Sequence, residues 1–126
     1  MIRFLLICLG GAAGTGARYL ASLWAVSAFG TAFPFGTLLV NVAGSFLLAF
    51  IMQVAGTTAM SEDLRLTLTT GVLGGFTTYF AFNYETTQLF RGSAWGSGFL
   101  NIAVTVTGCL LAGLAGFALA RAFAGR

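Results

Sequence analysis

The sequence predicts an all-α protein that spans a lipid bilayer four times. Hydrophobic residues make up 58% of the 126 residues and charged residues only 7%, whereas soluble domains carry roughly 25% charged residues. The mean hydropathy is +0.94, and a chain this short cannot bury so much apolar surface in a core of its own. The apolar residues gather in four stretches, each near the ~20 residues that cross a hydrocarbon layer of about 30 Å. We therefore expect most of the surface to face lipid.

The first apolar stretch covers residues 4–29. Its beginning is similar to a signal peptide, because Arg3 precedes a short apolar run. The apolar residues nevertheless continue beyond Arg18 to about Phe29, which is the length of a spanning helix rather than of a signal peptide. We expect one continuous membrane helix here.

Three further stretches cover residues 34–54, 64–91 and 95–123. The second begins at Pro34, a residue type that favours the start of a helix. Backbone groups in lipid must hydrogen bond to one another, so helices are the expected form of all four stretches. The connections are short, and residues 1–126 are expected to form a single transmembrane domain. Clustered glycines, such as Gly10, Gly11 and Gly14, suit close packing of neighbouring helices.

The third stretch differs from the others in its middle. Gly71, Gly74 and Gly75 are followed by Phe-Thr-Thr at 76–78. A break in a membrane helix is tolerated only where protein or a water-filled cavity covers the freed backbone groups. We expect such a break in this segment.

The charged residues give a small bias in orientation. If the two termini share one side of the membrane, that side carries four arginines, Arg3, Arg65, Arg121 and Arg126. The other side carries Arg91, and Arg18 lies towards that side, late in the first stretch. Arginine favours the cytoplasmic side, so cytoplasmic termini are favoured, but by so little that insertion in both orientations is conceivable. The scattered arginines do not form a nucleic-acid-binding patch.

The reactive residue types argue against an enzyme. The chain has no histidine, and its two cysteines, Cys8 and Cys109, lie inside apolar runs without a C-x-x-C pattern. We interpret both as packing residues, and we expect neither a zinc site nor a catalytic Cys–His arrangement.

Polar residues inside the second and fourth stretches are candidates for function. Thr37, Asn41 and Ser45 are four residues apart and therefore share one helix face. The amide of Asn41 offers two N–H donors, which suits the wall of a pore for an anion that loses its water. Asn101, Thr105 and Cys109 repeat this spacing. For both sets the alternative is that the polar groups only join neighbouring helices.

Aromatic residues follow the expected break, at 79–84. The edge of an aromatic ring is electropositive and can face an anion. The simpler explanation is that these rings fill the interior of the helix bundle, and from physics alone this explanation is favoured.

Arg18 and Glu85 are the two charged residues expected within or near the hydrocarbon layer. Arg18 could reach the interface, pair with Glu85 or bind backbone carbonyls. We favour a structural or vestibule role for both, because a bare arginine beside a small anion would bind it too tightly for fast release.

Three segments resemble the CrcB/Fluc family of small fluoride channels. They are the opening segment GGAAGTGARY at 10–19, the segment PFGTLLVN at 34–41 with Gly-Ser-Phe at 44–46, and the segment TGVLGGFTT at 70–78. The resemblance covers essentially the whole chain, in order. It implies a fluoride-selective channel that exports cytoplasmic fluoride passively through the inner (plasma) membrane of a bacterium.

The resemblance further implies an antiparallel, dual-topology homodimer with two pores and a structural sodium ion at its centre. The backbone carbonyls of Gly74 and Thr77 would hold the sodium ion, which suits a hard cation. Asn41 maps to the pore asparagine of the family, and Tyr79 and Phe82 map to its two pore phenylalanines. Glu85 maps to the glutamate that follows the break.

The sequence departs from the family after the double glycine. Tyr79 stands where phenylalanine is usual, Phe80 where serine is usual, and Ala81 where threonine is usual. Two hydroxyl groups expected near the pore are therefore absent. We predict an intact dimer with slower fluoride permeation.

Fluoride conduction would use amide donors from Asn41, hydroxyls such as that of Thr105, and the ring edges of Tyr79 and Phe82. Two alternatives remain. A small multidrug exporter would need a buried carboxylate, usually early in the chain, but the first stretch offers Arg18 and no acid. A non-transporting membrane assembly subunit would use its polar residues only for packing.

Overall fold

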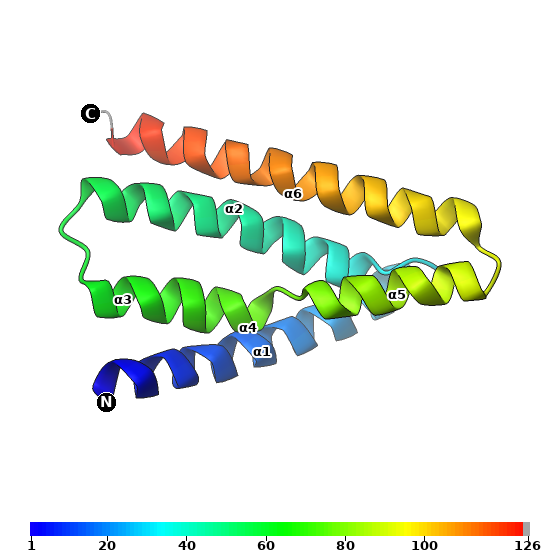
Figure 1. Cartoon of the computed structure of the whole chain (residues 1–126), viewed down its shortest axis with the longest axis horizontal. Coiled ribbons are helices and arrows are strands. Elements are labelled where there is room, and N and C mark those ends of the chain that lie inside the picture. Colours follow the sequence, from blue (N-terminus) through cyan, green and yellow to red (C-terminus); the bar gives the residue numbers. More distant parts are fainter. Residues whose placement is uncertain (125–126) are drawn as a thin grey trace.

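The computed structural model describes residues 1–124 and contains only helices and their connections (Figure 1). The elements in chain order are α1 (Ile2–Phe29), α2 (Phe35–Thr57), α3 (Glu62–Leu66), the π-helix η1 (Thr67–Leu73), α4 (Gly74–Phe76), α5 (Tyr79–Arg91) and α6 (Trp95–Ala124). Their bounds lie close to the four apolar stretches of the sequence. Arg126, counted above for the orientation of the chain, lies outside the described residues.

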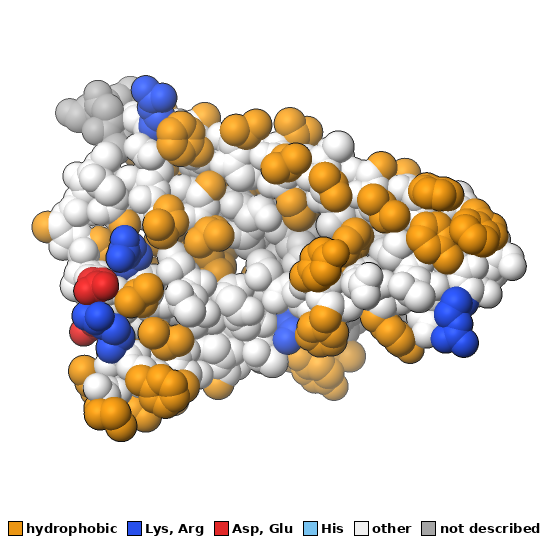
Figure 2. All heavy atoms as spheres, viewed as in Figure 1, with side chains coloured by type: hydrophobic (Ala, Val, Ile, Leu, Met, Phe, Trp, Pro, Cys, Tyr) orange, Lys and Arg blue, Asp and Glu red, His pale blue; other side chains and the backbone are white. Residues whose placement is uncertain are grey.

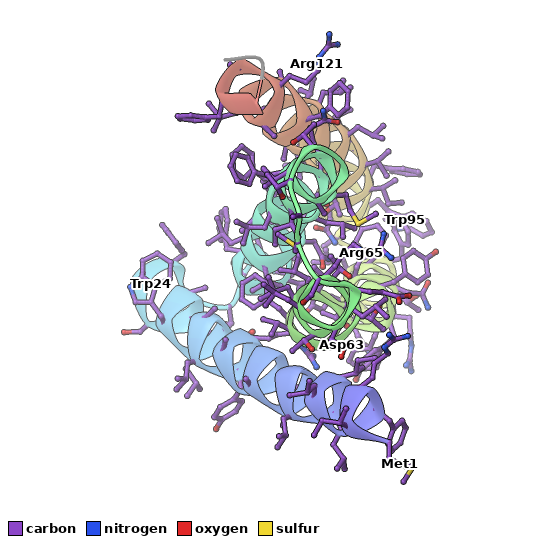
Figure 3. All side chains as sticks on the ribbon, turned by 90° about the vertical axis from the view of Figure 1, so that its left-hand side faces the viewer. Met1, Trp24, Asp63, Arg65, Trp95 and Arg121 are labelled. Carbon is purple, nitrogen blue, oxygen red and sulfur yellow. The ribbon has the colours of Figure 1, made fainter. Side chains whose placement is uncertain are left out.

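Along the chain, α1, α2, the segment α3–α5 and α6 run in alternating directions along one long axis (Figure 1). Both termini and the connection between α2 and α3 lie at one end, and the α1–α2 and α5–α6 connections lie at the other. Helix α6 packs mainly on α2, whereas α1 packs mainly on η1 and α4. In the end-on view, α1 and α6 therefore occupy opposite sides of the molecule (Figure 3).

Three helices of the described residues, α1, α2 and α6, are long and apolar enough to cross a membrane. Exposed large hydrophobic side chains are spread over the surface, as Figure 2 shows for one face. The residues buried inside are partly polar, and this buried polar set comprises Thr37, Asn41, Thr78, Thr86, Asn101 and Thr105. Such a distribution fits a chain whose surroundings are apolar, and it agrees with the predicted membrane protein.

Local sequence explains where the helices begin and end. Helix α1 ends at Gly30, whose φ of 78° is accessible to glycine at no steric cost. Helix α2 starts directly after Pro34. The Ser61 hydroxyl accepts a hydrogen bond from the Leu64 N–H at 3.3 Å and caps α3.

The segment between α2 and α6 is helical but interrupted. Thr77 and Thr78 have extended backbone angles between α4 and α5. The Thr78 hydroxyl accepts a hydrogen bond from the Ala81 N–H at 3.3 Å and so caps the second half-helix. The break predicted from the glycine and threonine cluster is therefore confirmed, and it lies at the two threonines.

Glycines let α1 approach this segment closely. A Cβ atom added at Gly14 would overlap the carbonyl oxygen of Val72, and one added at Gly75 would overlap that of Gly11. One added at Gly10 would lie 2.8 Å from the carbonyl oxygen of Thr67. The predicted small-residue packing is confirmed at this contact, and it brings the backbone of α1 against η1 and α4.

An ion cluster joins the start of α1 to the start of α3. Arg3 contacts Asp63 through Nε at 2.6 Å and Glu62 through Nη2 at 3.0 Å. These side chains are about half exposed, so the cluster contributes little to stability. The starts of α1 and α3 lie at the end of the bundle that carries both termini (Figure 1).

Candidate functional site

Asn41 forms a two-point contact with the break. Its Nδ2 donates to the carbonyl oxygen of Thr78 at 3.0 Å, and its Oδ1 accepts from the N–H of Thr78 at 2.8 Å. Asn41 and Thr78 are both buried. The amide thus replaces the helical partners that Thr78 lacks at the break. Its second N–H is left for another acceptor.

A cavity of about 420 Å³ lies beside this contact. Helix α2 contributes Asn41 and Ser45 to its wall, and α6 contributes Thr105 and Cys109. The remaining lining comes largely from the interrupted segment, namely Thr69, Leu73, Gly74, Thr77, Thr78, Tyr79 and Phe82. The structure therefore brings six of the predicted site residues together: Asn41, Gly74, Thr77, Tyr79, Phe82 and Thr105.

The two predicted pore rings are neighbours at the start of α5. The ring centroids of Tyr79 and Phe82 are 5.8 Å apart, with the ring planes tilted by 54°. Tyr79 is 78% exposed although it lines the cavity, so the cavity opens to the outside of the single chain. Phe80 is 72% exposed, and neither Phe80 nor Ala81 contributes to the cavity wall.

Glu85 lies at a second cavity, nearer the α1–α2 connection. This cavity is also about 420 Å³ and is lined by Thr37 and Glu85 together with residues of that connection. The Thr37 hydroxyl donates to Oε1 of Glu85 at 2.8 Å, whereas Oε2 is buried without a partner among the described residues. Thr37 and Asn41 are one turn apart on α2, so the polar face of this helix passes from one cavity to the other.

Arg18 binds a backbone carbonyl beside the break. Its Nε donates to the carbonyl oxygen of Gly75 at 3.0 Å, across from α1 to α4. Of the partners considered from the sequence, a carbonyl is therefore the one found. Because α4 ends directly after Gly75 and Phe76, the guanidinium supplies a donor that the helix no longer supplies itself.

The remaining carbonyls of the break include those predicted to hold sodium. The Thr78 N–H bonds to Asn41 and the Thr77 N–H bonds to Leu73. No donor of the described residues bonds to the carbonyl oxygens of Gly74 or Thr77. Uncharged oxygens without a donor are ligands that a hard cation accepts, so these two residues fit the predicted role.

Sequence reasoning missed two buried threonines that bond to residues it had singled out; Thr78 lines the cavity and Thr86 does not. Thr78 is the partner of Asn41, and Thr86 accepts a hydrogen bond from Asn101 at 2.9 Å. A threonine before a half-helix could have been identified as an N-cap. The Thr86 contact had no sequence signal, because its partner lies on another helix.

Replacing Arg18 with methionine is expected to destabilise the protein. The Gly75 carbonyl would lose its donor in an apolar environment, which costs about 1–3 kcal/mol. Thermal unfolding in detergent, followed by tryptophan fluorescence, measures the change. Arg91→Met, which alters an exposed arginine in the last turn of α5, is the matched control. Equal unfolding midpoints for the two variants would contradict the role of the Arg18 contact.

The chemistry available at these cavities is that of neutral hydrogen-bond donors and ring edges. Asn41 and Tyr79 offer N–H or O–H groups around one space, and the Thr105 hydroxyl at its wall donates to Asn101. Among the described residues, no group of three or more His, Cys, Asp or Glu side chains could hold a metal ion. Neutral donors and ring edges of this kind can coordinate a small anion.

Comparison with known proteins identifies the family. Residues 5–117 match the family model described as "CrcB-like protein, Camphor Resistance (CrcB)". The chain is 55% identical over 126 residues to a "Fluoride-specific ion channel FluC" of Anaeromyxobacter sp. (strain K), covering 99% of this chain and 100% of the relative. A relative with the same description from Sorangium cellulosum is 55% identical, covering 96% of each chain. One from Geobacter sulfurreducens is 47% identical, covering 96% of this chain and 98% of its own. The chain belongs to the CrcB family.

Proposed function

We propose that this protein is a fluoride-selective ion channel that lets fluoride leave the cytoplasm. The observation that carries the proposal is its similarity, over nearly the full length of both chains, to relatives named fluoride-specific ion channels. The cavity between α2, α6 and the break supplies a physical mechanism. As a channel, the protein catalyses no covalent reaction.

Fluoride is small and strongly hydrated, so a selective path must replace its water with other donors. The free N–H of Asn41 and the ring edges of Tyr79 and Phe82 surround one space and can replace this water. The Thr105 hydroxyl lines the same space but donates to Asn101 at 3.4 Å, so it would have to turn to donate to the ion. Because these groups are uncharged and spread over several positions, they bind the ion without trapping it. The width of the path would exclude the larger chloride ion.

The fourth membrane crossing and the dimer are part of the same proposal. Residues 62–91 would cross the bilayer as an interrupted helix, parallel to α1 in Figure 1. A second copy in the opposite orientation would close the cavity at the exposed ring of Tyr79 and would complete two pores. The small arginine bias is compatible with insertion in both orientations. We place the protein in the inner membrane of a bacterium, exporting fluoride that enters as neutral HF.

A sodium ion at the dimer centre is proposed on the chemistry of the break. Gly74 and Thr77 of each copy would hold it through backbone carbonyls that have no donor among the described residues. When bound, the ion would supply positive charge that joins the two breaks.

Fluoride efflux from proteoliposomes tests the function. Vesicles loaded with potassium fluoride and supplied with a potassium ionophore are expected to release fluoride to an ion-selective electrode. Vesicles loaded with potassium chloride are expected to retain chloride. A multidrug exporter would instead show proton-coupled uptake of an organic cation, and a non-transporting subunit would show no flux. Either result, without fluoride release, would reject the proposal.

Restoring the two missing hydroxyls is expected to accelerate permeation. The double variant Phe80→Ser, Ala81→Thr adds hydroxyl donors next to the two rings of α5, and we expect faster fluoride efflux per channel than from the wild type. Initial efflux rates at matched protein density measure the effect. An unchanged or slower rate would contradict the prediction that the missing hydroxyls slow permeation.

A further inference from the structure

Helix α5 carries both pore rings but has no helical continuity with α4. The extended residues Thr77 and Thr78 separate the two half-helices. The rotation of α5 about its own axis is therefore not fixed by the preceding helix, and side-chain contacts must fix it. This rotation decides whether Phe82 and Tyr79 face the cavity.

A buried chain of hydrogen bonds connects α5 to α6. The Thr105 hydroxyl donates to Oδ1 of Asn101 at 3.4 Å, and Nδ2 of Asn101 donates to the Thr86 hydroxyl oxygen at 2.9 Å. The Thr86 hydroxyl in turn donates to the carbonyl oxygen of Phe82 at 2.7 Å. Asn101 is 1% exposed and Thr86 is 6% exposed. This chain of hydrogen bonds therefore ends at the backbone carbonyl of Phe82, one of the two predicted pore rings.

The geometry assigns Asn101 and Thr86 a shared positioning role. We propose that their hydrogen bond, together with the Thr37–Glu85 contact to α2, sets the rotation of α5 and thereby the direction of Phe82 and Tyr79. This proposal rests on the proposed function as a fluoride channel. Thr86 and Phe82 are one turn apart and share a helix face. Asn101 does not line the cavity, and both ends of its amide are engaged within the protein. It therefore acts through α5 rather than as a ligand of the ion.

Selectivity is the readout that separates positioning from mere stability. Loss of a packing contact would lower the yield or the unfolding midpoint but would leave the correctly folded channels selective. Misdirected rings would instead lower the ratio of fluoride to chloride efflux. A buried hydrogen bond of this kind corresponds to roughly a five- to tenfold change in an equilibrium constant, and we expect a loss of selectivity of that size.

The experiment uses Thr86→Val and Asn101→Leu, singly and combined, in fluoride- and chloride-loaded proteoliposomes. Both single variants should lower the efflux ratio, and the double variant should lower it no further, because all three remove the same bond. Thr86→Ser, which keeps the hydroxyl, should retain the wild-type ratio. Thr87→Val is the matched control, since Thr87 is exposed and its hydroxyl donates only to the carbonyl of Asn83 at 2.9 Å.

Three outcomes would overturn the proposal. Wild-type selectivity in Thr86→Val would show that the bond positions nothing. If the double variant lost selectivity by the product of the two single losses, the two residues would act independently. Loss of flux in Asn101→Leu alone, with Thr86→Val normal, would make Asn101 an ion ligand. In each case the wild-type channel still conducts fluoride, whereas silent wild-type vesicles would reject the proposed function itself.

Discussion

Replacing Asn41 with leucine is expected to reduce fluoride efflux to the background of empty vesicles. The substitution nearly preserves the side-chain volume but removes both hydrogen bonds to Thr78. The N–H and carbonyl of Thr78 would then lie buried without partners, at about 1–3 kcal/mol each. The break would have to rearrange, and the cavity would also lose the free N–H of the amide. Efflux from proteoliposomes at equal protein density measures the result.

Gln53→Leu is the matched control for this variant. Gln53 also carries an amide on α2, but its side chain makes no hydrogen bond within the described residues. We expect it to conduct like the wild type. If Asn41→Leu conducted fluoride at the wild-type rate, the contact with Thr78 would be dispensable and Asn41 would not take part in permeation.

The helices could be predicted from the sequence because the thickness of the bilayer sets their length. The position of the break followed from glycines and threonines in the middle of an apolar stretch. The shared face of Thr37, Asn41 and Ser45 followed from their spacing of four. Each of these predictions depends on local patterns. The structure shows the expected break, and among the described residues α1, α2 and α6 are long and apolar enough to cross a membrane.

Contacts between helices could not be predicted in the same way. Asn41 and Thr78 are 37 residues apart, and no periodicity connects them. For Arg18 the sequence left the interface, Glu85 and backbone carbonyls open, and the structure places the guanidinium at the carbonyl of Gly75. For the polar residues of α6 the sequence left two roles open, a pore wall or contacts between helices. The structure gives different roles to different residues. Thr105 lines the cavity, whereas Asn101 is engaged with Thr86.

The π-helix η1 was also not predicted. A Cβ atom at Gly71 would lie 2.8 Å from the carbonyl oxygen of Ile7, so α1 presses directly on the backbone of η1. The glycines predicted close packing of α1 but did not identify η1 as its partner. Adding a single methyl group to α1 at Gly14 tests this close approach.

Gly14→Ala is expected to prevent α1 from packing on the interrupted segment. The new Cβ would overlap the carbonyl oxygen of Val72 and would lie 3.0 Å from the backbone nitrogen of Phe76. Backbone atoms cannot rotate away as a flexible side chain can, so the helices must separate. Overpacking typically costs about 1–3 kcal/mol and occasionally more. We expect a lower unfolding midpoint in detergent, together with loss of efflux because α4 leads into the break.

Whether Gly14→Ala raises or lowers the unfolding midpoint distinguishes the effect of packing from that of helix propensity. In a helix, alanine is more favourable than glycine by about 1 kcal/mol, so propensity alone predicts that Gly14→Ala stabilises the protein. Gly16→Ala and Gly56→Ala are the controls, because an added Cβ would meet no atom within 4 Å at either position. These two variants should unfold at or above the wild-type midpoint. A Gly14→Ala variant that shared their behaviour would show that α1 does not contact η1 as closely as described, and the position of Arg18 against the break would lose its support.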